Sequence, residues 1–326
     1  MRDNALPIKG AAKGPIRIAL IGECMIELQH IPGKGLQQTF GGDTLNTAIY
    51  MARVGRDLSL CVDYVTAVGT DCFSQAMTAF WEGERVGSSL VQRIDGKLPG
   101  LYFIQLDDAG ERSFFYWRSE SAARRCFEYE GSHSVLSGLE QYDAIYLSGI
   151  SLAILEPVSL ERLLARLSDL RARGKTIFFD YNHRPHLWPS QEKAVACYAR
   201  VAALSHTAFL SRDEGAALLG CETARDIHMH LLGMGVAESV IRDGRSPCSV
   251  CVGDRIFQID AKESVRVVDT TAAGDSFSAA YLVARMFGRS VQESAALGHA
   301  LAASVISCQG AVIPESAMPR DGVLGS

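Results

Sequence analysis

The stretch VDTTAAGDSF, residues Val268–Phe277, joins a strand-like segment to a helix that we expect at about Gly274–Phe287. Its small residues let a ligand come close to the main chain. The first N–H groups of a helix have no partner within the helix, so together they attract anions. The stretch therefore predicts an anion site built from the main chain of Ala272, Ala273 and Gly274.

Asp275 places a carboxylate inside this expected anion site, where it would repel a bound phosphate. The residue makes sense as a base that takes a proton from an attacking hydroxyl, while the neighbouring amides stabilise a transferred phosphoryl group. This division of roles predicts phosphoryl transfer, with Asp275, Gly274, Ala273 and Ala272 as the catalytic group. The alternative is that Asp275 simply caps the helix, because aspartate is favoured at such positions.

On the N-terminal side of this stretch, short apolar runs alternate with segments of helical periodicity. Near-continuous apolar strands that alternate with helices predict an α/β fold with a mostly parallel central sheet flanked by helices. We expect strands at Ile16–Ile21, Cys61–Val68, Asp143–Leu147, Thr176–Phe179, Thr207–Leu210 and Ser239–Arg242. Helices are expected at about Phe73–Arg85, Glu156–Arg173, Gly274–Phe287 and Val291–Cys308.

Two segments, about 27–40 and 98–117, carry strand-like residues with no helix between them. Within the second segment, Leu101–Leu106 and Ser113–Trp117 flank Asp107–Gly110, which has the composition of a hairpin turn. These segments predict a small β-sheet lid beside the α/β core.

Composition excludes several classes of protein. The 326 residues carry a net charge of −5 without a basic stripe, so we expect no nucleic-acid partner. No run of about 18 apolar residues occurs, which predicts no membrane association. The nine scattered cysteines fit a reducing compartment, and a cytoplasmic location is expected. Residues 1–15 lack a signal region and are expected to form a flexible N-terminal arm, residues 16–315 one domain, and residues 316–326 a C-terminal tail.

His228 and His230 are separated by one residue and have no third ligand nearby in the sequence. We therefore expect them on a solvated helix face rather than in a metal site.

A second glycine-rich segment, Phe40–Ala48, has the sequence FGGDTLNTA. The paired glycines Gly41 and Gly42 precede an apparent helix start and permit close approach of a polar ligand. Asp43 and Asn46 would supply hydrogen bonds to that ligand. A turn followed by a helix cap is the alternative.

The two segments together resemble the two signatures of the ribokinase-like (PfkB) carbohydrate kinase family. The first signature is Gly-Gly-x-x-x-Asn and the second is Asp-Thr-x-Gly-Ala-Gly-Asp; their order and separation match over Ile16–Pro314. The resemblance implies a ribokinase-like fold with a lid, and ATP-dependent phosphorylation of a sugar. Ala272 stands where the general pattern has glycine, so we expect that loop to hold a main-chain conformation acceptable to alanine.

Within the family, the chain is most similar to enzymes that phosphorylate 2-dehydro-3-deoxygluconate at its 6-hydroxyl. The resemblance implies that Arg118 and Arg184 hold the carboxylate of the sugar acid, since a guanidinium presents fixed donors and stays charged. It also implies that Tyr102 and Tyr116 face the sugar, together with Gly41, Gly42, Asp43, Asn46 and Asp275. Surface salt bridges for the arginines and lid packing for the tyrosines are the alternatives.

On the nucleotide side, the resemblance implies that ATP lies along the C-terminal half of the sheet. Glu214 would order Mg²⁺ through water, and Ser211 replaces the usual asparagine. The expected nucleotide contacts are Asn182, Arg184, Ser211, Glu214, Arg242, Gly244, Ala272, Gly274 and His299. A monovalent cation near the anion site and a homodimer formed through the lids are further family traits. Two other functions stay open: a kinase for another sugar, such as fructose or a related keto-deoxy acid, and a non-catalytic regulator that binds sugar or nucleotide.

Overall fold

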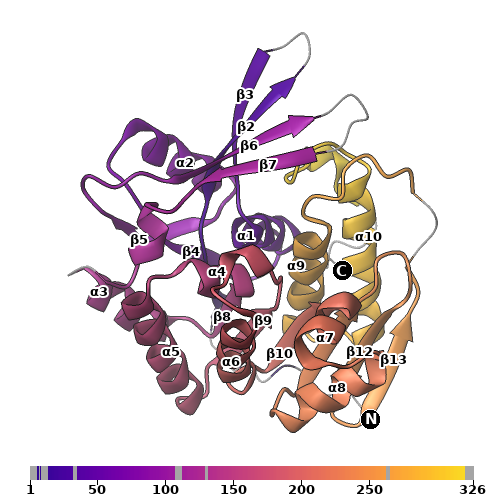
Figure 1. The fold of residues 1–326 in the computed structure, drawn as a ribbon. Coiled ribbons are helices and arrows are strands. Elements are labelled where there is room, and N and C mark those ends of the chain that lie inside the picture. The colour runs from indigo at the N-terminus through magenta and orange to yellow at the C-terminus, as the bar shows by residue number, and fades with distance from the viewer. Residues whose placement is uncertain are drawn as a thin grey trace.

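The fold is described from a computed structural model, which describes residues 6, 8, 14–31, 35–106, 112–128, 131–261 and 265–319. Figure 1 shows a large layered core with a small sheet projecting above it. The expected turn Asp107–Gly110 lies outside the described residues, as do most of the expected N-terminal arm and residues 320–326 of the expected tail. Leu6 is described, and it is buried in the core.

The core sheet has nine strands in the order β13-β12-β11-β10-β9-β8-β1-β4-β5. The strands from β11 to β5 pair in parallel, and β12 and β13 pair antiparallel at one edge. This confirms the mostly parallel central sheet. The strands are β1 (Ile16–Ile21), β4 (Leu60–Val68), β5 (Gly87–Arg93), β8 (Ala144–Ser148), β9 (Thr176–Asp180), β10 (Thr207–Ser211), β11 (Glu238–Arg242), β12 (Cys248–Val252) and β13 (Arg255–Ile259).

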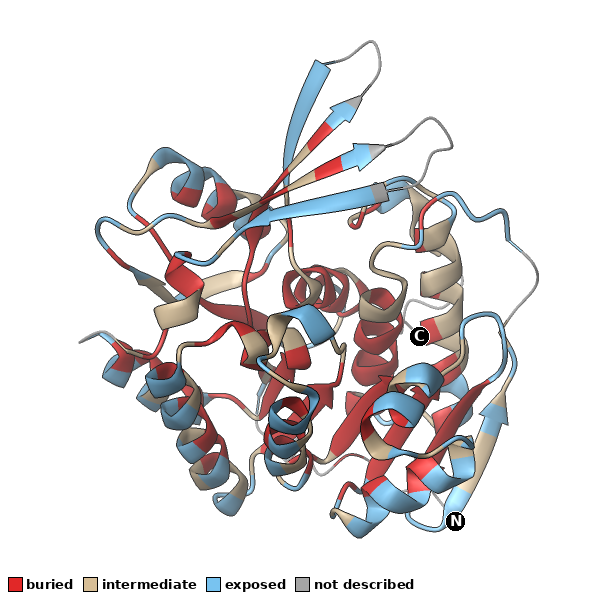
Figure 2. Ribbon diagram, viewed as in Figure 1, coloured by how far each residue is buried: buried red, intermediate tan, exposed pale blue. Residues whose placement is uncertain are grey.

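Helices cover both faces of this sheet, and each face has its own apolar cluster. Figure 2 shows that the central strands are largely buried, whereas the outer helices have exposed sides. One face is covered by α1 (Asp43–Val54), α2 (Cys72–Gly83), α9 (Ala273–Met286) and α10 (Val291–Ile306). The other is covered by α3 (Ser132–Gly138), α4 (Gly149–Ile154), α5 (Pro157–Ala172), α6 (Gln191–Ala202), α7 (Arg212–Leu219) and α8 (Ala224–Gly233). Short 3₁₀ helices are η2 (Ala122–Arg125), η3 (Leu139–Gln141), η4 (Pro185–Leu187) and η5 (Glu315–Ala317). Burial on both faces explains why the core strands are almost continuously apolar.

The second sheet has four strands in the order β3-β2-β6-β7: β2 (Met25–Ile31), β3 (Gly35–Gly41), β6 (Gly100–Leu106) and β7 (Arg112–Trp117). They correspond to the two segments that predicted a lid. Because side chains alternate across a strand, Tyr102 and Tyr116 face the core while Phe115 and Trp117 face outward.

All nine cysteines are free thiols. Among the described residues, no helix combines the length and the apolar character needed to cross a membrane. The expectation for the two histidines is wrong for His228, which is fully buried between α8 and the sheet and contacts Ser239 Oγ at 2.7 Å and Ser249 Oγ at 2.8 Å. His230 is exposed, as expected.

Candidate active site

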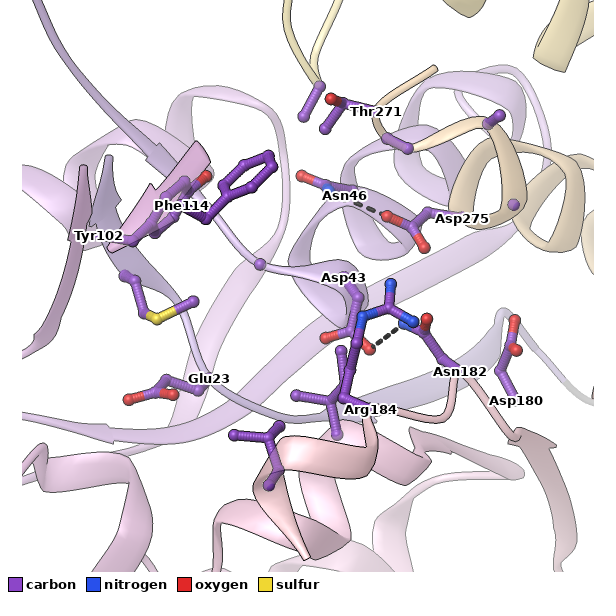
Figure 3. A pocket seen from close by; sticks show the side chains of 18 of the residues that line it. Glu23, Asp43, Asn46, Tyr102, Phe114, Asp180, Asn182, Arg184, Thr271 and Asp275 are labelled. Carbon is purple, nitrogen blue, oxygen red and sulfur yellow. Dashed lines mark hydrogen bonds between the residues drawn. The ribbon is translucent and has the colours of Figure 1, made fainter. Parts of the chain in front are cut away.

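A large cavity of about 660 Å³ lies between the lid and the C-terminal ends of the core strands. Ligands of open α/β sheets bind at this edge, because the loops that follow parallel strands meet there. Side chains enter the cavity from three directions: the lid, the strand ends, and the first turns of α1 and α9 (Figure 3). The predicted residues in its lining are Gly42, Asp43, Asn46, Tyr102, Tyr116, Arg118, Asn182, Arg184, Arg242, Ala272, Ala273, Gly274 and Asp275.

Gly41 is not part of that lining. A Cβ at this position would lie 2.6 Å from the hydroxyl oxygen of Tyr102. The glycine therefore leaves room for Tyr102, which is itself predicted to face the sugar.

The first turn of α9 presents Asp275 to the cavity. Asn46 Nδ2, from the first turn of α1, donates a hydrogen bond to Asp275 Oδ2 at 2.9 Å. The same turn of α1 carries Asp43, which accepts a hydrogen bond of 2.8 Å from Asn182 Nδ2. The two predicted glycine-rich segments, more than 220 residues apart in the sequence, therefore meet at Asp275 (Figure 3).

Shielding from bulk water, together with the nearby negative charge of Asp43, raises the pKa of Asp275 to about 8. The hydrogen bond from Asn46 acts in the opposite direction and lowers this pKa. A carboxyl group with a pKa near neutral can accept a proton from a hydroxyl far more readily than an ordinary aspartate.

The loop before α9 is shaped by Asp269 and Ala272. Asp269 accepts hydrogen bonds from the amide and the hydroxyl of Thr271 and from the amide of Gly310. Ala272 has φ 61° and ψ 13°, in the left-handed region. Alanine can adopt this conformation, but it costs a residue with a Cβ about 1–2 kcal/mol. It explains why glycine suits this position in the general family pattern.

Arg118, at the end of lid strand β7, forms an ion pair with Glu23, which follows β1. The Glu23 side chain is 1% exposed and that of Arg118 is 10% exposed, and both line the cavity. Removing one partner of such a buried pair leaves an uncompensated charge, which costs about 3–5 kcal/mol. The arginine that the sequence assigned to a carboxylate is thus held in place by a carboxylate of the protein.

The lid meets the core through aromatic residues as well. The hydroxyl of Tyr102 donates a hydrogen bond to Glu27. Burial raises the pKa of Tyr102 far above its usual range, and the negative charge of Glu27 is the next largest cause. The ring of Tyr116 stacks on His186 of η4, with ring centroids 6.1 Å apart. Tyr116 therefore bridges the lid and the core at the edge of the large cavity.

A small cavity of about 390 Å³ lies on the other side of the α9 N-terminus. It contains the predicted nucleotide residues Asn182, Arg184, Ser211, Glu214, Arg242, Gly244, Gly274 and His299. Asn182, Arg184, Arg242, Ala273 and Gly274 line both cavities. A group transferred between a ligand in one cavity and a ligand in the other would pass these five residues.

Glu214 and His299 have defined partners in the small cavity. The two Glu214 carboxylate oxygens accept hydrogen bonds of 2.6 Å from the amides of His183 and Ser211. These bonds orient the carboxylate. His299 Nε2 lies 3.2 Å from the carbonyl oxygen of Ile259, and its ring packs edge-on against Phe277.

Sequence reasoning missed Glu23 and Asp180. Asp180, the last residue of β9, forms a bidentate ion pair with Arg242 at 2.7 and 2.9 Å. Both missed acids stand at or just after the C-terminal end of a predicted strand, and both line the large cavity. Their position at strand ends was the signal that could have identified them.

The profile of the pfkB family carbohydrate kinases matches residues 16–318. The chain therefore belongs to the pfkB family of carbohydrate kinases, which confirms the resemblance found in the sequence. The fold agrees: a PfkB protein from Polaromonas sp. JS666 superposes with a TM-score of 0.79 at 22% identity, over 90% of this chain and 96% of the other.

Two more similar relatives have narrower names. A protein from Dickeya dadantii (strain 3937) is 48% identical over 93% of this chain and 98% of its own length. A protein from Escherichia coli (strain K12) is 46% identical over 93% of this chain and 99% of its own length. Both are named 2-dehydro-3-deoxygluconokinase.

Proposed function

We propose that this protein transfers the γ-phosphoryl group of ATP to the 6-hydroxyl of 2-dehydro-3-deoxy-D-gluconate. The observation that carries the proposal is Asp275, which lies in the large cavity at the start of α9 with Asn46 bonded to one carboxylate oxygen. The near-full-length similarity to two proteins named for this substrate supports the choice of sugar.

In the proposed reaction the sugar acid occupies the large cavity and ATP the small one. Asp275 accepts the proton of the 6-hydroxyl as the oxygen attacks the γ-phosphorus. The main-chain amides of residues 272–275 stabilise the negative charge of the transferred group. Closure of the lid excludes water and so limits the hydrolysis of ATP.

In the small cavity, Mg²⁺ would need ligands from the phosphates of the nucleotide in addition to those from the protein. Among the described residues, no group of three or more histidine, cysteine or acidic side chains could hold a metal ion. Mg²⁺ is commonly bound by substrate phosphates, water and one or two carboxylates. Glu214 would orient the water shell of the ion, and the bound ion would neutralise phosphate charge. A monovalent cation near the Asp269 loop stays a proposal from the family resemblance.

The carboxylate of the substrate would be held by Arg118 and Arg184. Glu23 fixes Arg118, while the partner found for Arg184 is the main-chain carbonyl of His183 at 3.0 Å. Charge-assisted hydrogen bonds from these donors contribute about 1.5–3 kcal/mol each. A neutral sugar such as fructose would leave the arginines without that partner, so this site favours the sugar acid.

The base is tested with Asp275→Asn, which keeps the shape of the side chain but cannot accept the proton. We expect kcat to fall by about 10²–10⁴-fold while ATP still binds, as measured by titration calorimetry. Asp213→Asn, on the exposed first turn of α7, is the matched control and should retain wild-type kcat. Normal turnover by Asp275→Asn would remove the proposed base.

The alternative functions have their own discriminators. For a kinase of neutral sugars, Arg184→Gln would leave kcat/KM for the natural substrate unchanged. Arg118→Gln also leaves the buried Glu23 without its partner, so for this variant the readout is the ratio of kcat/KM for the sugar acid to kcat/KM for a neutral sugar, which would stay unchanged. We expect instead a loss of about tenfold or more for the sugar acid, since each lost charge-assisted bond contributes 1.5 kcal/mol or above. A non-catalytic regulator would bind ligands and show no turnover, which the intact Asp275 and its hydrogen bond argue against.

A further inference from the structure

Two arginines join strand β11 to helix α9, one at each end of the strand; Arg285 is fully buried and Arg242 is partly buried. At the first residue of β11, Glu238 pairs with Arg285 of α9 at 2.7 Å, and both side chains are 1% exposed. At the last residue, Arg242 reaches the first turns of α9, where its Nη1 atom lies 3.1 Å from the carbonyl oxygen of Gly274 and 3.0 Å from Ser278 Oγ. Only the second of these arginines lies in the lining of the two cavities.

Asp180 is the central acceptor in the contacts between Arg242 and α9 at the cavity end of β11. Its carboxylate accepts both hydrogen bonds from Arg242, another of 3.1 Å from Ser278 Oγ, and one of 3.3 Å from the hydroxyl of Tyr146. Only 3% of its side chain is exposed. Four donors from β8, β11 and α9 therefore fix the orientation of this carboxylate, and the bidentate pairing fixes the plane of the Arg242 guanidinium.

Because Arg242 donates a hydrogen bond to the carbonyl oxygen of Gly274, the orientation of the arginine affects the main chain of the anion site. A Cβ on Gly274 would lie 2.9 Å from Arg242 Nη1, so the glycine gives the arginine access to this carbonyl. The carbonyl of Gly274 and the N–H of Asp275 belong to one planar peptide unit. Holding the carbonyl oxygen therefore sets the direction in which the Asp275 amide points, and the position from which its side chain begins.

We propose that Asp180 is a positioning residue for phosphoryl transfer: through Arg242 it fixes the first peptide units of α9, and with them the anion site and the base Asp275. This inference rests on the proposed function, because the anion site is the place where the phosphoryl group is transferred. A misplacement of about 1 Å in such a group can cost about 10²-fold in rate. Asp180 touches neither reacting group in this scheme. It acts through Arg242, and its negative charge also contributes to the raised pKa of Asp275.

The chain supplies a matched control in Glu238. Asp180 and Glu238 are both buried acids paired with an arginine between the sheet and α9, and both accept a tyrosine hydroxyl, from Tyr146 and Tyr281 respectively. Glu238→Gln removes a buried charge of the same kind without touching a cavity. The two substitutions should therefore both lower the melting temperature, whereas only Asp180→Asn should lower the rate of the folded enzyme.

The experiment compares Asp180→Asn and Glu238→Gln by steady-state kinetics and by hydrogen–deuterium exchange. Asp180→Asn should lower kcat by about 10²-fold with the KM for each substrate within about threefold of wild type. It should also speed amide exchange at residues 272–276. Glu238→Gln should retain the wild-type kcat, and amide exchange at those residues should stay as slow as in the wild type. Equal effects of the two variants on kcat, or unchanged exchange at residues 272–276 in Asp180→Asn, would overturn the inference.

Two further variants cover the case in which Asp180→Asn does not fold. Ser278→Ala removes one partner of both Asp180 and Arg242 and should lower kcat less, in the same direction. Arg242→Ala should be slow and should recover part of its kcat on addition of millimolar guanidinium; full activity of Ser278→Ala together with no recovery would contradict the proposal. Exchange at residues 272–276 needs no turnover, so it judges the positioning role even if the wild type fails to phosphorylate the proposed sugar.

Discussion

Two residues of α1, Asp43 and Asn46, have opposite effects on the pKa of Asp275. The negative charge of Asp43 raises the pKa of Asp275, second to the effect of shielding from water, and the hydrogen bond from Asn46 lowers it. Asp43 and Asn46 are three residues apart, so both lie on the same side of the first turn of the helix. One helix turn thus both raises and lowers the pKa of the proposed catalytic group, beside the effects of burial and of the charges of Asp180 and Arg242.

The first prediction concerns the pH dependence of kcat/KM in the wild type. The pKa of Asp275 is raised to about 8, and the base works only when it is deprotonated. Activity should therefore be lost as pH falls through about 8, by about tenfold per pH unit on the acidic side. A kcat/KM that is constant from pH 6 to 9 in a rate assay would contradict the assignment of this residue as the base.

The second prediction uses the two α1 residues. Asp43→Asn removes the charge that raises the pKa, so the acidic limb of kcat/KM should move to lower pH. Asn46→Ala removes the hydrogen bond that lowers it, so the limb should move to higher pH. Both variants should also lose activity because both residues line the cavity, but the position of the limb is read independently of its height. Shifts of the same sign in both variants would show that Asp275 does not control the limb.

At the scale of elements, α8 places His228 on its buried face, although the sequence pattern predicted an exposed position. Residues Ile227, His228 and Leu231 are all buried against the sheet. Burial lowers the pKa of His228 to about 4, because a charged imidazolium would lose its water there. The neutral ring instead contacts two serine hydroxyls, which satisfies both of its nitrogens.

The third prediction follows from this lowered pKa. The native pKa lies below the ordinary value of about 6.5, so the stability due to neutral His228 is complete above about pH 6.5 and is lost as pH falls toward 4. The full loss is roughly 3 kcal/mol, since each pKa unit is about 1.4 kcal/mol. Urea unfolding at several pH values measures it: His228→Gln should be less stable at pH 7 and flatter between pH 6.5 and 4. His230→Gln, on the exposed side of α8, should keep the wild-type slope; identical slopes in all three proteins would refute the prediction.

Elements differed in how far the sequence predicted them. The core strands with continuous apolar runs were predicted almost to the residue, as β1 shows. Edge strand β5, GSSLVQR, was missed because it is only half-buried, so its pattern is neither apolar throughout nor regularly alternating. His228 was misplaced because a buried polar residue depends on tertiary partners, here Ser239 and Ser249, that no local pattern reveals.

The site residues also differ in how far the sequence predicted them. The glycine-rich segments and Asp275 were predicted because their local pattern and order match a known pair of signatures. Glu23 and Asp180 were missed because their roles depend on arginines 95 and 62 residues away. The left-handed conformation of Ala272 was also hidden, since the residue type itself disfavours it.

At the scale of the molecule, the lid has an uncovered apolar face. Leu36, Phe115 and Trp117 are 59%, 46% and 62% exposed on the side of the lid that faces away from the large cavity. The outer strands β3 and β7 also leave main-chain groups available for pairing at the edges of the lid. These features support the homodimer that the family resemblance implies.

The fourth prediction tests this dimer. Trp117→Glu places a charge on the uncovered face and should convert a dimer into a monomer of about half the mass, measured by sedimentation velocity at micromolar concentration. Val158→Glu, at a 48% exposed position of α5, is the control and should not change the mass. A wild type that sediments as a monomer would contradict the prediction.

The most direct measurement is the rate of ADP release with ATP and Mg²⁺ in the presence of 2-dehydro-3-deoxygluconate, fructose, ribose or no sugar. The geometry of Asp275, Arg118 and Arg184 predicts strong turnover with the sugar acid alone. Turnover with a neutral sugar instead would keep Asp275 as the base but contradict the assignment of the arginines to a carboxylate, and no turnover with any sugar would contradict the proposed function itself.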